Sequence, residues 1–151
     1  MLRDYLQPEL IRFHVKAQDW QTAIYLGGEL LVNQQICTQK YIDACIQASY
    51  DLGPYMVISP GIALAHSRPE NGALQIGMSI ITLDPAVNFG NKNNDPVGLL
   101  ITFCGIDHNS HIGMLQELAT FLMDERNQQF LFKVNTAEEL ITYLQDSERK
   151  M

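Results

Sequence analysis

Apolar runs of strand length alternate along this chain with amphipathic stretches of helix length, and the alternation predicts an α/β fold. Strands are expected at residues 11–15, 55–58, 74–83 and 97–103. Helices are expected at residues 20–31, 38–52, 110–122 and 136–144. We therefore expect a single domain over residues 1–151, in which a central mixed β-sheet carries helices on both faces. Residues 147–151 are expected to form a frayed tail.

Capping residues, glycine and proline indicate where these helices begin and end. Asp19 precedes the first helix and Ser110 the third, and both are residue types that cap helix N-termini. The second helix should stop at Gly53-Pro54, because neither residue continues a helix easily. Thr136 and Glu139 have the spacing of a capping box. On the third helix we expect a core face of Leu115, Leu118, Ala119 and Leu122.

The acidic balance of the chain excludes several classes of partner. Lys and Arg number 10 against 17 Asp and Glu, for a net charge of −7. Nucleic acids and anionic membrane surfaces bind clustered basic residues, so neither is an expected partner. The three cysteines are an odd number without a CxxC pair, which indicates a reducing compartment. No stretch resembles a signal peptide or a membrane-spanning helix, so we expect a cytoplasmic protein.

His66 is the first candidate for a reactive residue. It follows an apolar strand and lies in a segment with Gly61 before it and Gly72 after it. Sites commonly form where strands of an α/β sheet end, and glycines allow a ligand or partner to approach the backbone closely. A neutral imidazole is a nucleophile that can accept a phosphoryl group and return it. The alternative is a loop histidine without a chemical role.

The segment 107–111, Asp-His-Asn-Ser-His, is the second candidate. His108 and His111 could share one helix face and, with Asp107, bind a metal ion as a small hydrolase would. Alternatively, if Ser110 caps the helix, His111 lies in a first turn whose N–H groups favour phosphate. The sequence contains no Walker A or dinucleotide motif, so a donor other than a nucleotide is expected. We expect neither a cofactor nor a metal.

The run Gly61-Ile-Ala-Leu-Ala-His66 resembles the phosphohistidine motif of the mannitol- and fructose-type (type 2) EIIA proteins of the sugar phosphotransferase system. The segment Ser110-His111-Ile112 resembles that family's second histidine region, and the likeness covers nearly the whole chain. The amino-acid sequence of residues 53–70 is most similar to that of the ascorbate-type branch. Two departures stand out. Ala65 replaces the family's proline before the histidine, and residues 43–51 lack the arginine of the mannitol-type proteins. We expect Arg68 to supply positive charge instead.

The resemblance implies a phosphoryl carrier. The carrier protein HPr would phosphorylate His66, which would pass the group to a cysteine of the cognate EIIB protein and onward to sugar at the membrane component EIIC. His111 would stabilise the phosphoryl oxygens or orient His66. Ile62 and Leu64 could supply apolar contact to these partners or pack inward. A phosphorylation-dependent regulatory binding module is the alternative function, and monomer and homodimer both stay open.

Overall fold

The five strands form one mixed sheet in the computed structural model, which describes residues 2–149. Across the sheet the order is β1 (Ile11–Val15), β4 (Gly77–Val87), β5 (Val97–Cys104), β3 (Ile62–Ala65) and β2 (Val57–Ser59). The pairs β1–β4 and β3–β5 are parallel, whereas β4–β5 and β2–β3 are antiparallel. The mixed sheet is therefore confirmed, with the apolar strand β5 at its centre.

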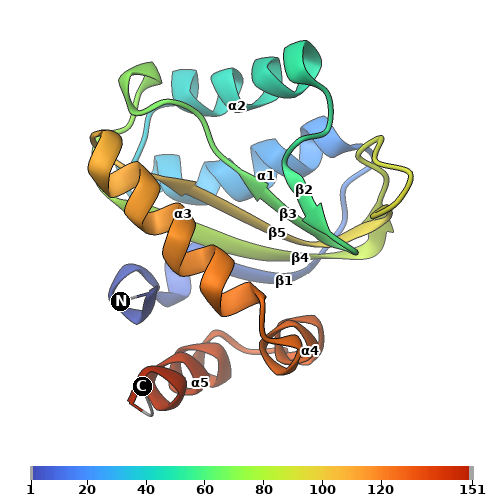
Figure 1. Cartoon of the computed structure of the whole chain (residues 1–151), viewed down its shortest axis with the longest axis vertical. Helices are drawn as coiled ribbons and strands as arrows, with labels where there is room; N and C mark the ends of the chain where they lie inside the picture. Colours follow the sequence, from blue (N-terminus) through green and yellow to red (C-terminus); the bar gives the residue numbers. More distant parts are fainter. Residues whose placement is uncertain (1, 150–151) are drawn as a thin grey trace.

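Helices cover both faces of the sheet, as predicted (Figure 1). One face carries α1 (Trp20–Asn33) and α2 (Gln39–Leu52). The other carries α3 (His108–Leu122), α4 (Glu125–Lys133) and α5 (Ala137–Arg149). Short 3-10 turns complete the chain at η1 (Leu2–Tyr5), η2 (Pro8–Leu10) and η3 (Pro69–Asn71). Two clusters of buried apolar residues lie between these layers, one on each side of the sheet.

The strand that leads directly to His66 was not predicted. All four residues of β3 are buried, and β3 lies between β5 and β2. The run expected as a buried strand, residues 55–58, is instead the sheet edge, where Ile58 is exposed. Gly61 adopts φ 78° and turns the chain from β2 into β3. A left-handed residue at this turn explains how two strands fit into one short apolar stretch.

Other elements also differ from the prediction in their ends or in the residues they bury. Strand β4 covers Gly77–Val87 and therefore starts and ends later than the predicted strand 74–83. Helix α4 was not predicted because its sequence is strongly polar. The core face of α3 is Met114, Leu118 and Leu122, whereas Ala119 is exposed and Leu115 only partly buried. Helix α5 continues through Arg149 and so includes the first three residues of the expected tail 147–151. Residues 150 and 151 lie outside the described part of the chain.

The packing of α1 against α2 requires glycine at position 28. A Cβ added to Gly28 would lie 2.5–2.9 Å from side-chain carbons of Ile42. We expect Gly28→Ala to lower the free energy of unfolding by about 1–3 kcal/mol through overpacking. The matched control is Gly113→Ala, because a Cβ at Gly113 meets nothing within 4 Å. That helical substitution should be stabilising by about 0.5–1 kcal/mol. Urea unfolding of both variants checks the pair, and equal effects would contradict the packing argument.

Candidate functional site

His66 stands at the carboxyl end of β3, next to the central strand β5. The last paired residues of the two strands are Ala65 and Thr102, so His66 is the first residue beyond the ladder. Ala65 is fully buried, whereas the His66 side chain is partly exposed. His66 therefore does stand at a strand end, although the strand is β3 and not the run 55–58 that was predicted. His66 combines a backbone anchored in the sheet with a ring that solvent can reach.

One ring nitrogen of His66 is already engaged. Its Nδ1 lies 3.0 Å from the carbonyl oxygen of Leu64, which can only accept a hydrogen bond. Nδ1 must therefore carry the proton. In the neutral ring, Nε2 then holds the free lone pair. The hydrogen bond to the backbone selects the tautomer and leaves Nε2 as the nucleophilic atom.

Three aromatic rings surround His66. Phe103 stacks on it with ring centroids 5.0 Å apart, and Tyr55 meets it edge-on at 5.6 Å. His111 lies 5.5 Å away, and Phe103 also contacts the His111 ring at 5.6 Å. Phe103 is fully buried, so it serves as a fixed surface against which both imidazoles pack. The structure thus brings together the two histidines that the sequence singled out.

The first turn of α3 differs from the prediction because Asp107, not Ser110, is its N-cap. The Asp107 carboxylate accepts hydrogen bonds from the Ser110 N–H (2.8 Å) and hydroxyl (2.7 Å). The N–H of His111 is bonded to the Asp107 carbonyl (3.0 Å) and is not free for phosphate. A carboxylate already occupies this helix end, so the expected phosphate-binding role of the first-turn N–H groups is not favoured.

Gly105 allows α3 to start close to the end of β5. A Cβ at this position would lie 2.3 Å from the backbone N of His111 and 2.6 Å from its Cα. No side chain fits there without moving the first turn of α3. The close approach holds His111 beside the strand end that carries His66.

Burial keeps both histidines in their neutral forms. It lowers the pKa of His66, an effect opposed by the hydrogen bond to Leu64 and reinforced by nearby His111. Burial also lowers the pKa of His111; His108 acts in the same direction and Glu70 opposes it. The Nδ1 of His111 is buried without a hydrogen-bond partner among the described residues. Near pH 7, one neutral ring can act as a nucleophile while the other forms hydrogen bonds beside it.

Arg68 lies two residues beyond His66 and is exposed. It borders a hollow of about 670 Å³ whose wall also includes Glu70, His108 and His111. Within the described part of the chain, the Arg68 backbone carbonyl accepts a hydrogen bond from the Asn71 N–H (3.0 Å), but no hydrogen bond or ion pair engages the guanidinium. Its guanidinium is therefore available to an anion near His111.

The remaining sequence candidates do not join this site. Across the described residues, no group of three or more His, Cys, Asp or Glu side chains could hold a metal ion, so His108, His111 and Asp107 are not assembled as metal ligands. Cys45 is fully buried in the core, and burial raises the pKa of its thiol, so it is inert. His14 is exposed and bonds Asn135 (2.7 Å).

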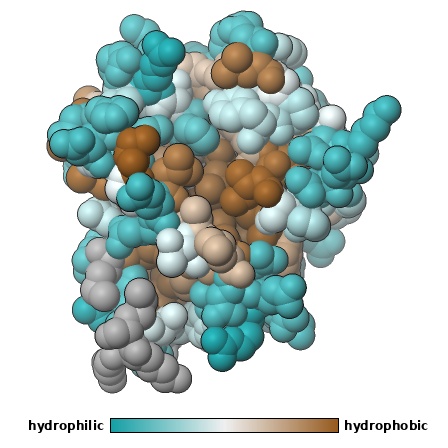
Figure 2. All heavy atoms as spheres, in the orientation of Figure 1, coloured by the Kyte–Doolittle hydropathy of each residue, from teal (hydrophilic) through white to brown (hydrophobic). Residues whose placement is uncertain are grey.

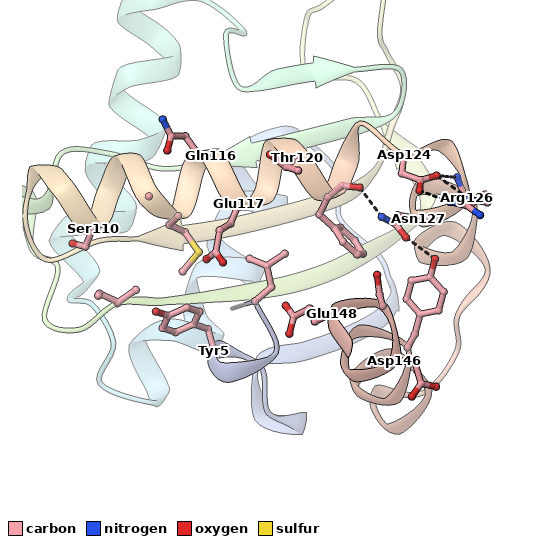
Figure 3. A pocket seen from close by; sticks show the side chains of 17 residues that line it. Tyr5, Ser110, Gln116, Glu117, Thr120, Asp124, Arg126, Asn127, Asp146 and Glu148 are labelled. Carbon is pink, nitrogen blue, oxygen red and sulfur yellow. Dashed lines mark hydrogen bonds and ion pairs between the residues drawn. The ribbon is translucent and has the colours of Figure 1, made fainter. Parts of the chain in front are cut away.

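A second hollow lies away from His66. A groove of about 1100 Å³ runs along α3 between Ser110 and Asp124, and Tyr5 and Glu148 lie across from that helix (Figure 3). Figure 2 shows apolar side chains in the middle of this face, with polar residues around them. Neither His66 nor His111 lines the groove. This groove is therefore separate from the pair of histidines.

Several residues that shape the site were missed by sequence reasoning. The sequence predicts Phe103 only as a residue of a strand and Tyr41 only as a residue of a helix, as both are found. Tyr55 was assigned to a buried strand, although it contacts His66 from the surface. An aromatic residue at the end of the predicted strand beside His66 was the signal available for Phe103.

Comparison with known proteins identifies relatives over nearly the whole chain. The family model described as the phosphoenolpyruvate-dependent sugar phosphotransferase system, EIIA 2, matches residues 4–147. The ascorbate-specific PTS system EIIA component of Salmonella typhimurium is 37% identical over 143 residues, covering 93% of this chain and 92% of that protein. Its counterpart in Escherichia coli K12 is 36% identical over the same length and coverage.

Solved structures show the same fold. The mannitol-specific cryptic enzyme IIA of Escherichia coli superposes with a TM-score of 0.83 at 35% identity, covering 92% of this chain and 94% of that one. The Escherichia coli complex of enzyme IIA and phosphorylated enzyme IIB for mannitol matches with a TM-score of 0.81 at 25% identity, over 93% and 97%. No helix in the described part of the present chain is long and apolar enough to cross a membrane.

The depressed pKa of His66 makes folding stability depend on pH. Below about pH 6.5 the unfolded chain binds a proton that the folded ring resists, so stability should fall as pH drops from 7 to 5. We expect His66→Gln to have a shallower slope of unfolding free energy against pH, because that contribution disappears. Urea unfolding at stepped pH measures both slopes; identical slopes would show that His66 titrates normally.

The tight contact at Gly105 predicts a local effect of substitution. Gly105→Ala should displace the first turn of α3 and weaken the contact between His66 and His111, since its Cβ would overlap the backbone of His111. We expect changed ¹H–¹⁵N resonances for residues 105–112 and a lower free energy of unfolding by about 1–3 kcal/mol. Unchanged resonances for this segment would mean that α3 does not need the glycine.

Proposed function

The chain belongs to the EIIA type 2 family of the phosphoenolpyruvate-dependent sugar phosphotransferase system, and we propose that His66 is its phosphoryl acceptor. Family membership makes the chain a phosphotransferase component, a phosphoryl carrier for sugar transport. The observation that supports His66 is its ring: Nδ1 is tied to the Leu64 carbonyl, and the side chain remains partly exposed. The donor is the phosphohistidine of HPr, and transfer takes place in the cytoplasm.

The proposed reaction is two in-line displacements. The Nε2 lone pair of His66 forms a bond to phosphorus as the bond to the donor imidazole breaks, and the donor nitrogen keeps that electron pair. In the second step a cysteine thiolate of the EIIB partner forms the new bond to phosphorus, and Nε2 recovers its lone pair. Such transfers depend mainly on positioning and charge stabilisation. The Leu64 carbonyl holds the Nδ1 proton through both steps.

His111 and Arg68 provide the polar environment for the transferred group. The ring of His111 lies 5.5 Å from that of His66, close enough for a phosphoryl group on Nε2 to contact it. Arg68 is an exposed guanidinium bordering the same hollow as His111 and can bind phosphoryl oxygens in a bidentate manner. A donor on each side would share the charge of the phosphoryl oxygens.

Partner proteins would contact the exposed apolar residues around the histidines. Tyr55, Ile106 and Ile112 are all exposed; Tyr55 touches His66, Ile106 borders the hollow, and Ile112 follows His111. Ile62 and Leu64 both pack inward instead. HPr and EIIB would use this surface in turn, and a small interface, below about 1,200 Å² in total, suits such exchange.

Ascorbate or a related sugar is the proposed transport substrate. The Salmonella and Escherichia coli relatives at 36–37% identity are named as ascorbate-specific components. An EIIB protein is the acceptor, as the mannitol complex of Escherichia coli illustrates for that system, and the group would pass to sugar at EIIC. The transport names of these relatives favour a carrier over a regulatory binding module.

Phosphorylation in vitro tests the acceptor. Incubation with phosphoenolpyruvate, the phosphoenolpyruvate-dependent enzyme and HPr should add one acid-labile phosphoryl group, seen by intact mass. His66→Gln should accept none, because the proposed acceptor ring is lost, whereas the exposed control His14→Gln should be labelled like the wild type. Equal labelling of His66→Gln would move the acceptor elsewhere, with His111 the next candidate.

Arg68 has its own test. Arg68→Ala should slow phosphoryl acceptance by about 10-fold or more, since a charge-assisted contact to the phosphoryl oxygens is lost. Lys40→Ala is the matched control, because it removes one positive charge from the exposed start of α2 and should leave the rate unchanged. A normal rate for Arg68→Ala would remove this residue from the site.

A further inference from the structure

A single buried hydroxyl joins the chain segment of His66 to the segment that packs against it. Tyr41 lies on α2 and is fully buried. Its hydroxyl oxygen accepts a hydrogen bond from the Ser67 N–H (2.9 Å) and donates to the carbonyl oxygen of Phe103 (2.7 Å). The carbonyl of Ser67 is farther away, at 3.2 Å, so the one hydroxyl proton points to Phe103.

The bridge stands just beyond the point where β3 and β5 stop pairing. The last register pair is Ala65 with Thr102, and the Tyr41 hydroxyl connects residues one and two positions further along the two segments. It thereby satisfies a backbone donor and a backbone acceptor that would otherwise be buried and unpaired. The hydroxyl continues the connection between the two segments after their direct ladder ends.

Both ends of the bridge act on the reactive rings. Ser67 directly follows His66, so its N–H fixes the peptide plane on one side of the histidine. Phe103 carries the ring that stacks on His66 at 5.0 Å and contacts His111 at 5.6 Å. Through one oxygen atom, Tyr41 thus sets where the His66 backbone lies relative to the aromatic surface shared by both histidines.

We propose that Tyr41 is a positioning residue for phosphoryl transfer, holding the His66 ring in register with Phe103 and His111. The inference rests on the proposed role of His66 as acceptor. Tyr41 is fully buried and cannot touch a partner protein, so its effect must come through His66. A small misplacement of a nucleophile can lower the reaction rate by up to about 100-fold. Loss of a single buried hydrogen-bond bridge can therefore slow phosphoryl transfer measurably.

Further hydrogen bonds hold the loop after His66, and they help a variant that lacks the Tyr41 hydroxyl to stay folded. Asn71 donates from its side-chain nitrogen to the Ser67 hydroxyl (2.9 Å), and Gly72 accepts from the Thr38 N–H (2.9 Å). These contacts hold the loop against the start of α2. Tyr41→Phe therefore keeps the ring in the core and removes only the link between Ser67 and Phe103.

The test compares two variants that each lose one buried hydroxyl. Tyr41→Phe removes the bridge, and Ser79→Ala removes the fully buried Ser79 hydroxyl, which donates to the Gly27 carbonyl (2.7 Å) on the α1 side of the sheet. For each we would measure the single-turnover rate of phosphoryl acceptance against donor concentration, and the ¹⁵N shifts of the His66 ring. We expect Tyr41→Phe to lower the maximal rate about 10-fold or more, with half-saturation by the donor unchanged and the ring shifts altered.

Ser79→Ala should keep both the wild-type rate and the wild-type ring shifts. Equal rates and shifts for Tyr41→Phe and the wild type would overturn the proposal, as would an equal slowing of both variants. If Tyr41→Phe does not fold, amide hydrogen exchange of the wild type decides: Ser67 protected like the β3 amides supports the bridge, and exchange at the rate of an open loop overturns it. A wild type that accepts no phosphate would instead defeat the proposed function of His66.

Discussion

The hydrogen bond between the His66 ring and the Leu64 carbonyl is the contact on which the proposed chemistry of this protein depends. At 3.0 Å from an oxygen that can only accept, Nδ1 must carry the proton, and Nε2 is left with the lone pair. The contact is local, spanning two residues, so it needs a backbone that holds the Leu64 carbonyl still. That backbone is β3, a buried strand between two others.

The rest of the site is arranged around that fixed ring. Phe103 gives His66 and His111 a common apolar surface, and Gly105 lets α3 start near enough to bring His111 there. Burial then lowers the pKa of both rings and favours their neutral forms. Arg68 places an exposed guanidinium at the hollow that His111 also borders. In the proposed transfer, a neutral imidazole beside an exposed guanidinium suits a group that arrives with negative charge and must leave again.

The sequence predicted much of this arrangement, because strand and helix periodicity are local. It placed His66 at a strand end and paired it with His111 through family resemblance. It could not predict β3, since four apolar residues after a glycine turn look the same as a loop that approaches a core. The N-cap of α3 was misplaced because Asp107 and Ser110 are both good caps, and only the fold decides between them. The Tyr41 bridge joins three distant segments, which no local pattern encodes.

The most direct measurement of the central claim is which ring nitrogen of His66 carries phosphorus. Long-range ¹H–¹⁵N spectra of the phosphorylated protein, labelled at histidine, distinguish the two N-phosphohistidine isomers. Attachment at Nε2, with the Nδ1 proton still bonded to the Leu64 carbonyl, is the result that the geometry requires. A phosphoryl group on Nδ1 would mean that the hydrogen bond breaks before transfer, and the ring would then not be held in advance for the reaction.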